Sequence, residues 1–125
     1  MKDINGVKIK ELYAYHIKTA GCLSGVKPVR PHQIDGEFDE PRQMNHVREE
    51  FREFIDAYND GRRNGWDEDR EDHFLEEGID LITVVLTELK AHIEDALDTP
   101  HCGDAIIRDG VDRVNEKNAK RHYFD

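Results

Sequence analysis

Apolar residues recur every three to four positions through most of the chain, which is the spacing of one face of an α-helix. The pattern predicts a short amphipathic segment within residues 1–21 and longer helices near 41–58, 69–97 and 104–121. Residues 21–40, 59–66 and 98–103 interrupt the pattern with glycine, proline, asparagine and aspartate, and are expected to be connections. We therefore predict an all-α fold, a bundle of four to five helices that forms a single domain over residues 1–125.

The helix that begins near Pro41 has Asp39 as its candidate N-cap and places the proline in its first turn. At about 100° per residue, its apolar face is formed by Met44, Val47, Phe51, Phe54, Ile55 and Tyr58. Glu50 and Glu53 fall together beside this face, whereas Glu49 lies nearly opposite it. Taken alone, the helix favours the interpretation that all three glutamates are solvated charges balanced by neighbouring arginines.

The helix predicted at 69–97 is apolar around most of its circumference, so its middle is expected to be buried. Asp80 lies within this apolar stretch, and Glu77 precedes it on the same stripe. A buried carboxylate without a partner is costly, so Asp80 requires a cation, a hydrogen-bond network or a raised pKa. A salt bridge from Asp80 to a core arginine is the alternative. Gly78 is expected to let another helix or a ligand come close.

Glu50, Glu53, Glu77 and Asp80 would meet if the two acidic helices turned these faces toward each other. Four carboxylates in one small space repel each other unless a cation neutralises them. Hard oxygen ligands favour Mg²⁺, with Mn²⁺ able to substitute. An iron-carboxylate bundle is the rival, but it expects Glu-x-x-His pairs that neither acidic motif contains. We therefore predict a magnesium centre with these four carboxylates as metal ligands.

The composition is polar and acidic, since 37% of the residues are apolar, 37% are charged and the formal net charge is −10. Such an acidic excess argues against binding of a nucleic acid polymer, which needs a basic surface. The low apolar content suggests that the core is completed by a partner subunit. The longest apolar run, Ile79–Leu86, contains polar residues and is too short to span a membrane.

Cys22 and Cys102 are far apart in the sequence, and both are expected to be reduced thiols of a cytoplasmic protein. The polar N-terminal residues show no signal-peptide pattern, in line with that expectation. His101 next to Cys102 would suggest zinc, but no further ligand stands at the spacing that zinc sites use.

The helix predicted at 104–121 is the one locally basic segment of the chain. Its apolar stripe ends with Val114, and Asn118 continues that stripe with an amide where an apolar residue would be expected. Lys117 and Arg121 flank this amide. An inward amide between two cations suits the recognition of phosphate oxygens and of a base or sugar edge. A solvated C-terminal helix is the alternative.

Together these segments resemble the MazG-like, all-α nucleoside triphosphate pyrophosphohydrolases, whose relatives include phosphoribosyl-ATP pyrophosphohydrolase and the dimeric dUTPases. The resemblance covers residues 10–124, although the final residues after Arg121 lack the glycine that the family pattern would place there. It is carried by two acidic motifs and a basic one: Glu49, Glu50 and Glu53; Glu76, Glu77 and Asp80; and Lys117, Asn118, Lys120 and Arg121.

The resemblance implies Mg-dependent cleavage of a (d)NTP to the (d)NMP and pyrophosphate, in keeping with a house-cleaning role in the nucleotide pool. It implies that Glu50, Glu53, Glu77 and Asp80 are catalytic metal ligands and that Lys117, Asn118 and Arg121 bind the substrate. It also implies assembly as a homodimer or homotetramer. Three alternatives stay open at this point. They are a non-catalytic helical module that binds a nucleotide or a protein, a phosphoribosyl-ATP pyrophosphohydrolase-like enzyme, and a purely structural oligomer.

Overall fold

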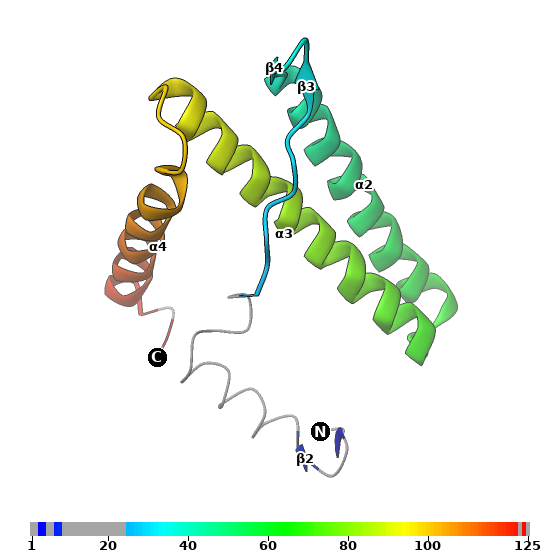
Figure 1. Ribbon diagram of the computed structural model, residues 1–125. Helices are drawn as coiled ribbons and strands as arrows, with labels where there is room; N and C mark the ends of the chain where they lie inside the picture. The colour runs from blue at the N-terminus through cyan, green and yellow to red at the C-terminus, as the bar shows by residue number, and fades with distance from the viewer. Residues whose placement is uncertain (1–2, 5–6, 9–24, 123, 125) are drawn as a thin grey trace.

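Three long helices dominate the computed structural model, which describes residues 3–4, 7–8, 25–122 and 124 (Figure 1). They are α2 (Glu40–Asn64), α3 (Glu68–Ala96) and α4 (Gly103–Lys120). Two minimal antiparallel hairpins accompany them, β1 (Asp3–Ile4) with β2 (Val7–Lys8), and β3 (Gln33–Ile34) with β4 (Glu37–Phe38). The described part of the chain is thus mostly helical, as predicted, with three helices where four to five were expected. The amphipathic pattern expected within residues 1–21 falls chiefly on residues 9–20, which lie outside the described residues.

The start of α2 follows the sequence signals, but its end does not. The Asp39 side chain accepts a hydrogen bond from the Arg42 backbone N–H at 3.2 Å, and Pro41 lies in the first turn. The connection expected at 59–66 is wrong for most of its length, because the helix continues through Asn64. Gly61, which suggested a break, is buried and gives room to the ring of Trp66, so packing outweighs its poor helix propensity.

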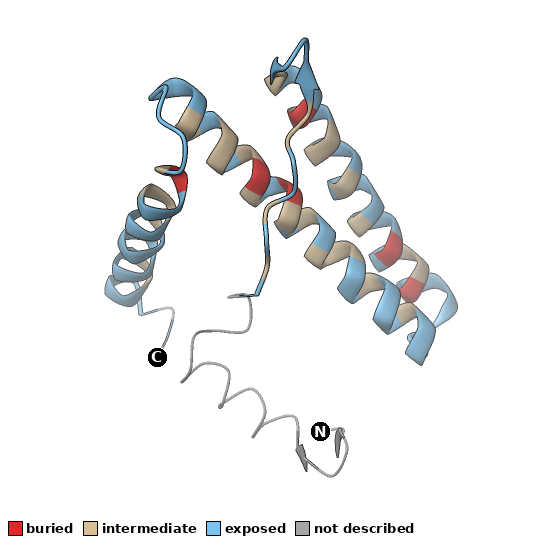
Figure 2. Ribbon diagram, in the orientation of Figure 1, coloured by how far each residue is buried: buried red, intermediate tan, exposed pale blue. Residues whose placement is uncertain are grey.

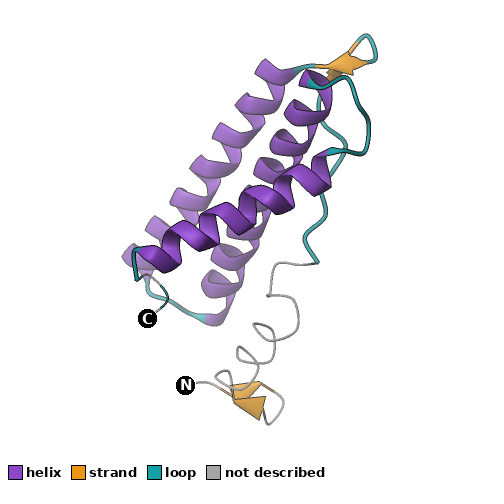
Figure 3. Ribbon diagram, turned by 90° about the vertical axis from the view of Figure 1, so that its left-hand side faces the viewer, coloured by secondary structure: helices purple, strands orange, loops and turns teal. Residues whose placement is uncertain are grey.

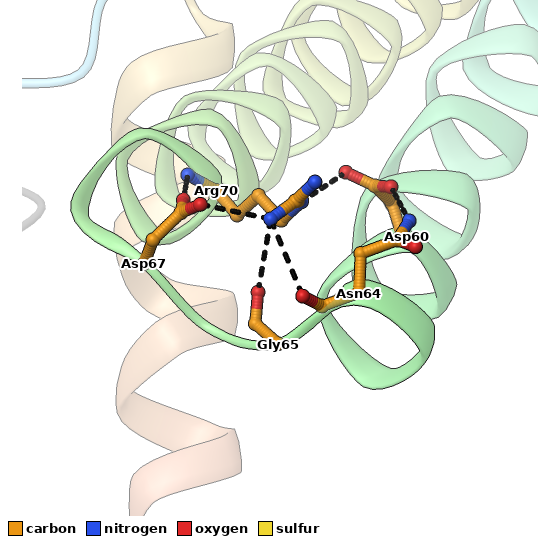
Figure 4. A network of polar contacts seen from close by, with 5 residues as sticks. All are labelled: Asp60, Asn64, Gly65, Asp67 and Arg70. Atoms are coloured by element: carbon orange, nitrogen blue, oxygen red, sulfur yellow. Dashed lines mark hydrogen bonds and ion pairs between the residues drawn. The ribbon is translucent and has the colours of Figure 1, made fainter.

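The turn from α2 to α3 is held by one arginine (Figure 4). Arg70 Nε donates to Asp60 Oδ2 at 3.1 Å, and its Nη1 donates to Asp67 Oδ2 at 2.8 Å. Asp67 also caps α3 by accepting from the Arg70 backbone N–H at 2.8 Å. Gly65 takes the left-handed φ of 92° that the sharp reversal requires. The guanidinium therefore joins the last turn of α2 to the first turn of α3.

The helices α2 and α3 pack antiparallel along their length, as Figure 1 shows. The rings of Phe54 and Phe74 stack across the interface with centroids 4.9 Å apart. A Cβ atom on Gly78 would lie 3.2 Å from the Phe54 ring, which confirms that this glycine allows a close helix approach. Trp66 closes the end of this aromatic cluster against Phe74, at a centroid distance of 5.3 Å.

The core between the helices is thin (Figure 2). Among the described residues, Ala57 and Val84 are the buried apolar side chains. The prediction that the middle of α3 is buried holds for Val84 but not for Ile82, Val85 and Leu89, which are all exposed in the single chain. Phe51, expected in the core, is 54% exposed. The cause is that α2 covers α3 along one side only, so that several apolar positions of α3 receive no cover from α2.

The helix α4 lies on the opposite side of α3 from α2, as Figures 1 and 3 both show. It begins within one residue of its predicted start and is anchored there by Gly103, whose backbone N–H donates to Glu94 Oε2 at 2.9 Å. A Cβ atom on Gly103 would lie 2.8 Å from Lys90 Cγ, so only glycine allows this approach. Farther along α4, Val111 and Val114 are exposed.

The described part of the expected loop, residues 25–39, crosses the helix pair as an extended segment and ends in the β3–β4 hairpin (Figure 1). Two buried polar side chains hold it. The Val29 N–H donates to Thr87 Oγ1 at 3.0 Å, and the His32 N–H donates to Gln43 Oε1 at 3.2 Å. Asp35 and Gly36, with φ angles of 52° and 80°, form the hairpin turn.

No helix in the described ranges carries an apolar stretch long enough to cross a membrane.

Candidate metal centre

Three of the four predicted carboxylates meet where the middle of α2 faces the first half of α3. One carboxylate oxygen from each of Glu50, Glu53 and Glu77 lies within 4.8 Å of one from each of the others. The side chains of Glu50 and Glu77 are each 16% exposed, whereas Glu53 lies at the solvent edge. The i, i+3 spacing on α2 and the antiparallel packing of α3 are what bring these oxygens together.

Two of these carboxylates each have a buried oxygen that accepts no hydrogen bond. Among the described residues, three side-chain oxygens are inaccessible to solvent and lack a partner: Glu50 Oε2 and Glu77 Oε2 here, and Glu88 Oε2 elsewhere on the interface between α2 and α3. Burial raises the pKa of both Glu50 and Glu77, and the neighbouring charge of Glu53 raises each pKa further. Buried acceptors without donors are rare in proteins, so this site has the electrostatic character of one that binds a cation.

Asp80 differs from its prediction. It was expected to be buried within the apolar stretch of α3, but it is exposed and does not share the close cluster of Glu50, Glu53 and Glu77. The reason is the one-sided cover of α3, which leaves the Asp80 position facing solvent. Its charge nevertheless contributes to raising the pKa of both Glu50 and Glu77, so it belongs to the rim of the site.

Two histidines that the sequence reading did not assign to the site contact its carboxylates. His46 Nε2 lies 3.3 Å from Glu50 Oε1, and His73 Nδ1 lies 3.8 Å from Glu77 Oε1. Both pairs have i, i+4 spacing, so the sequence held a signal for them. A third histidine, His32, places Nε2 3.0 Å from Nδ1 of His46.

The basic group predicted to bind substrate is not brought to the cluster within one chain. Lys117 is exposed and Asn118 is half-buried in the last turns of α4, and Arg121, which directly follows this helix, is exposed. No hydrogen bond or ion pair between described residues joins them to the carboxylates of α2 and α3. Glu49 is exposed and outside the cluster, as predicted.

A second group of possible ligands lies at the other end of the α2–α3 interface. Glu40, Glu88 and His92 place ligand atoms within 4.8 Å of one another. His92 Nδ1 lies 2.6 Å from Glu40 Oε2, and burial together with the Glu40 carboxylate raises the pKa of Glu88 to about 7. The sequence pattern did not reveal this group, because Glu40 lies far from Glu88 and His92 in the sequence and only the fold brings the three together.

Comparison of the chain with models of known protein families, with curated proteins and with solved structures finds no match. The resemblance to the MazG-like enzymes therefore rests on the residue pattern alone.

Proposed function

We propose that this protein is a Mg-dependent nucleoside triphosphate pyrophosphohydrolase that cleaves a (d)NTP to the (d)NMP and pyrophosphate. The observation that supports the proposal most directly is the pair of buried, donor-free oxygens Glu50 Oε2 and Glu77 Oε2, on two different helices and next to Glu53. Three converging carboxylates suit a hard divalent cation, which proteins hold with a few carboxylates while substrate phosphates complete the shell.

In this proposal, Glu50, Glu53 and Glu77 hold the cation, and Asp80 adds negative charge at the solvent edge. Mg²⁺, when bound, supplies charge neutralisation for the phosphates and favours ionisation of water as the nucleophile. Glu53 is exposed and closest to solvent among the three, so it is the carboxylate best placed to orient an incoming water molecule. Glu50 and Glu77, which are largely buried, serve as fixed ligands.

Lys117, Asn118 and Arg121 are proposed to bind the phosphates and the nucleoside. Because α4 carries them away from α2, a complete pocket requires these residues from a second copy of the chain or a movement of α4. The exposed apolar surfaces of α2, α3 and α4 favour the first possibility, since an uncovered apolar face of this extent is typical of a subunit interface. We therefore propose a homo-oligomer, a dimer or a tetramer.

The test is pyrophosphate release from a panel of ribo- and deoxyribonucleoside triphosphates, with Mg²⁺ and with EDTA. The expected result is Mg-dependent release that Glu77→Gln lowers at least about 100-fold, while the far-ultraviolet circular dichroism stays unchanged. Asp80→Asn and Glu53→Gln test the rim and the water-orienting position. Glu49→Gln is the matched control, because Glu49 is an exposed neighbour outside the cluster. Full activity in Glu77→Gln, or no activity of the wild type on any nucleotide, would contradict the proposal.

A further inference from the structure

Side-chain contacts from His32 to His46, and from His46 to Glu50, link the extended segment before α2 to the carboxylate cluster. His32 Nε2 and His46 Nδ1 are 3.0 Å apart, and His46 Nε2 is 3.3 Å from Glu50 Oε1. Two successive ring contacts thus lead from the segment that crosses the helix pair to one oxygen of a buried carboxylate. The other oxygen of that carboxylate is the buried, donor-free Oε2.

The backbone of His32 is fixed at both of its polar groups, so the position of its ring is determined by the fold. Its N–H donates to Oε1 of the buried Gln43, and its carbonyl accepts from the Asp39 N–H at 2.8 Å. The Gln43 side chain is itself anchored on α3 through Val84. The ring of His32 meets that of His46 edge to face, with centroids 5.0 Å apart.

The chemistry of the Glu50 carboxylate determines which atoms donate and which accept in these contacts. A carboxylate only accepts, so the atom of His46 that faces Glu50, Nε2, carries the proton. In the neutral ring Nδ1 is then an acceptor, and His32 Nε2–H is the donor that it meets. A donor at His32 Nε2 and an acceptor at Glu50 therefore favour the same tautomer of His46, the one that donates to Glu50.

We propose that His46 is the positioning residue of the metal centre and that His32 stabilises the tautomer of His46 that donates to Glu50. The proposal rests on the proposed function, because it assigns Glu50 as a metal ligand. By donating to Oε1, His46 fixes the rotation of the Glu50 carboxylate and leaves Oε2, which has no hydrogen-bond donor, to bind the cation. Such outer partners orient ligands in metal sites and are worth about 10–100-fold in metal affinity.

His73 provides a matched control within the same site. It stands at the same i, i+4 spacing from Glu77 as His46 does from Glu50, but its Nδ1 is 3.8 Å away, beyond hydrogen-bond distance. The His73 side chain is also 55% exposed, compared with 31% for His46. If the histidines acted only through charge, their removal would have similar effects.

The first experiment measures binding of Mg²⁺ and Mn²⁺ alone to the full chain by calorimetry. His46→Ala is expected to weaken binding by about 10–100-fold, and His46→Gln, whose amide can donate to Glu50, to recover most of the loss. His73→Ala is expected to change the affinity less than about fivefold. Equal effects of His46→Ala and His73→Ala, or wild-type affinity in His46→Ala, would overturn the proposal.

The second experiment reads the tautomers directly, without metal or substrate. Long-range ¹H–¹⁵N spectra of histidine-labelled protein are expected to show His46 protonated at Nε2 and unprotonated at Nδ1. In His32→Ala, His46 is expected to become a mixture of tautomers. An Nδ1-protonated His46 in the wild type, or a tautomer unaffected by His32→Ala, would overturn the role of His32.

The two experiments separate this inference from the proposed function. Tight metal binding that is insensitive to His46 would overturn the positioning role and leave the metal centre standing. Absence of any metal binding in the wild type would overturn both the metal centre and the role of His46 as its positioning residue, even where the tautomer is the expected one.

Discussion

The side chain of Gln43 joins the Val84 carbonyl on α3 to the backbone N–H of His32. Its Nε2 donates to Val84 at 3.3 Å, and its Oε1 accepts from His32 at 3.2 Å. Gln43 is only 1% exposed, so both halves of a buried amide are used to tie three segments together. Thr87 is equally buried. Its hydroxyl accepts from the Val29 N–H and donates to the Thr83 carbonyl. The extended segment is therefore held by two buried polar side chains, and both have hydrogen-bond partners, as buried polar groups generally do.

Gln43→Leu tests this arrangement. The variant loses both hydrogen bonds and leaves the His32 N–H without its acceptor, so we expect the free energy of unfolding to fall by about 1–3 kcal/mol. Urea denaturation followed by circular dichroism measures the change. Gln33→Leu is the control, because Gln33 is exposed and bonds only to Arg30 on the surface. Similar stabilities of the two variants would show that Gln43 does not anchor the segment.

Gly61→Ala is expected to move Trp66. A Cβ atom at position 61 would lie 2.4 Å from the far end of the Trp66 ring, so the indole has to leave its place between Gly61 and Phe74. Trp66 is the only tryptophan, and its fluorescence therefore reports on this contact alone. We expect the emission maximum to shift to longer wavelength as the ring enters water. An unchanged spectrum would mean that the ring does not pack on Gly61.

Gly110→Ala is the counterpart of that substitution on α4. The nearest atom to the added Cβ is an Arg113 nitrogen at 3.7 Å, an ordinary contact. Because glycine is unfavourable within a helix, we expect the free energy of unfolding to rise by ~0.5–1 kcal/mol. Thermal and urea unfolding measure it, and the Trp66 emission is expected to stay unchanged. Destabilisation by this substitution would indicate that α4 packs more tightly at Gly110 than the contacts show.

Local signals predicted the starts of the helices well, because capping is decided by neighbouring residues. Asp39 and Pro41 set the start of α2 whatever the rest of the chain does. The end of α2 could not be predicted in this way, since the room that Gly61 gives Trp66 is a tertiary contact. The β3–β4 hairpin does carry a local signal, the Asp35–Gly36 pair, although the prediction places residues 21–40 in a connection without strands.

The candidate site was predictable in part, for a related reason. The i, i+3 spacing paired Glu50 with Glu53 on α2 and Glu77 with Asp80 on α3, because spacing along one helix fixes the direction that two side chains share. The exposure of Asp80 could not be predicted from spacing, since it depends on how many neighbours cover α3. The link from His32 to His46 also required the fold, which brings the extended segment back over α2.

The apolar groove between α2 and α3 is expected to be covered by a second copy of the chain. It is lined by Val47, Phe51, Ile55, Leu81 and Val85 and has a volume of about 630 Å³. We expect light scattering to give a mass above the 14.6 kDa of one chain. The double variant Phe51→Asp, Ile55→Asp places charges on this apolar surface and should lower the mass toward the monomer. A monomeric wild type would contradict the prediction.

Leu75→Asp is the control for the groove variant. Leu75 is 63% exposed, and it does not line the groove. The substitution adds one such negative charge, against two in the groove variant, to an exposed apolar position, so a general effect of charge on association would appear in both variants. We expect the mass of the Leu75→Asp protein to equal that of the wild type.

Glu88 is expected to make the protein less stable as the pH rises from about 5 to about 8. Burial, and then the Glu40 carboxylate beside it, raise the pKa of Glu88 from 4.5 to about 7 in the folded chain. The folded state therefore binds this proton more tightly than the unfolded state, so its contribution to stability is fully present below pH 4.5 and is lost as the pH rises through 7. The His92 pKa, raised by Glu40, acts in the same direction, and the Glu40 pKa, lowered by Glu88 and His92, acts in the opposite one.

Glu88→Gln keeps the shape of the protonated side chain but cannot lose a proton as the pH rises. We expect its thermal midpoint to match that of the wild type near pH 5 and to exceed it by a few degrees at pH 8, measured with EDTA present. Glu76→Gln, an exposed change on the same helix, is expected to track the wild type at both values. A Glu88→Gln protein that is less stable than the wild type at pH 8 would instead mean that the ionised Glu88 carboxylate has a favourable partner in the folded chain.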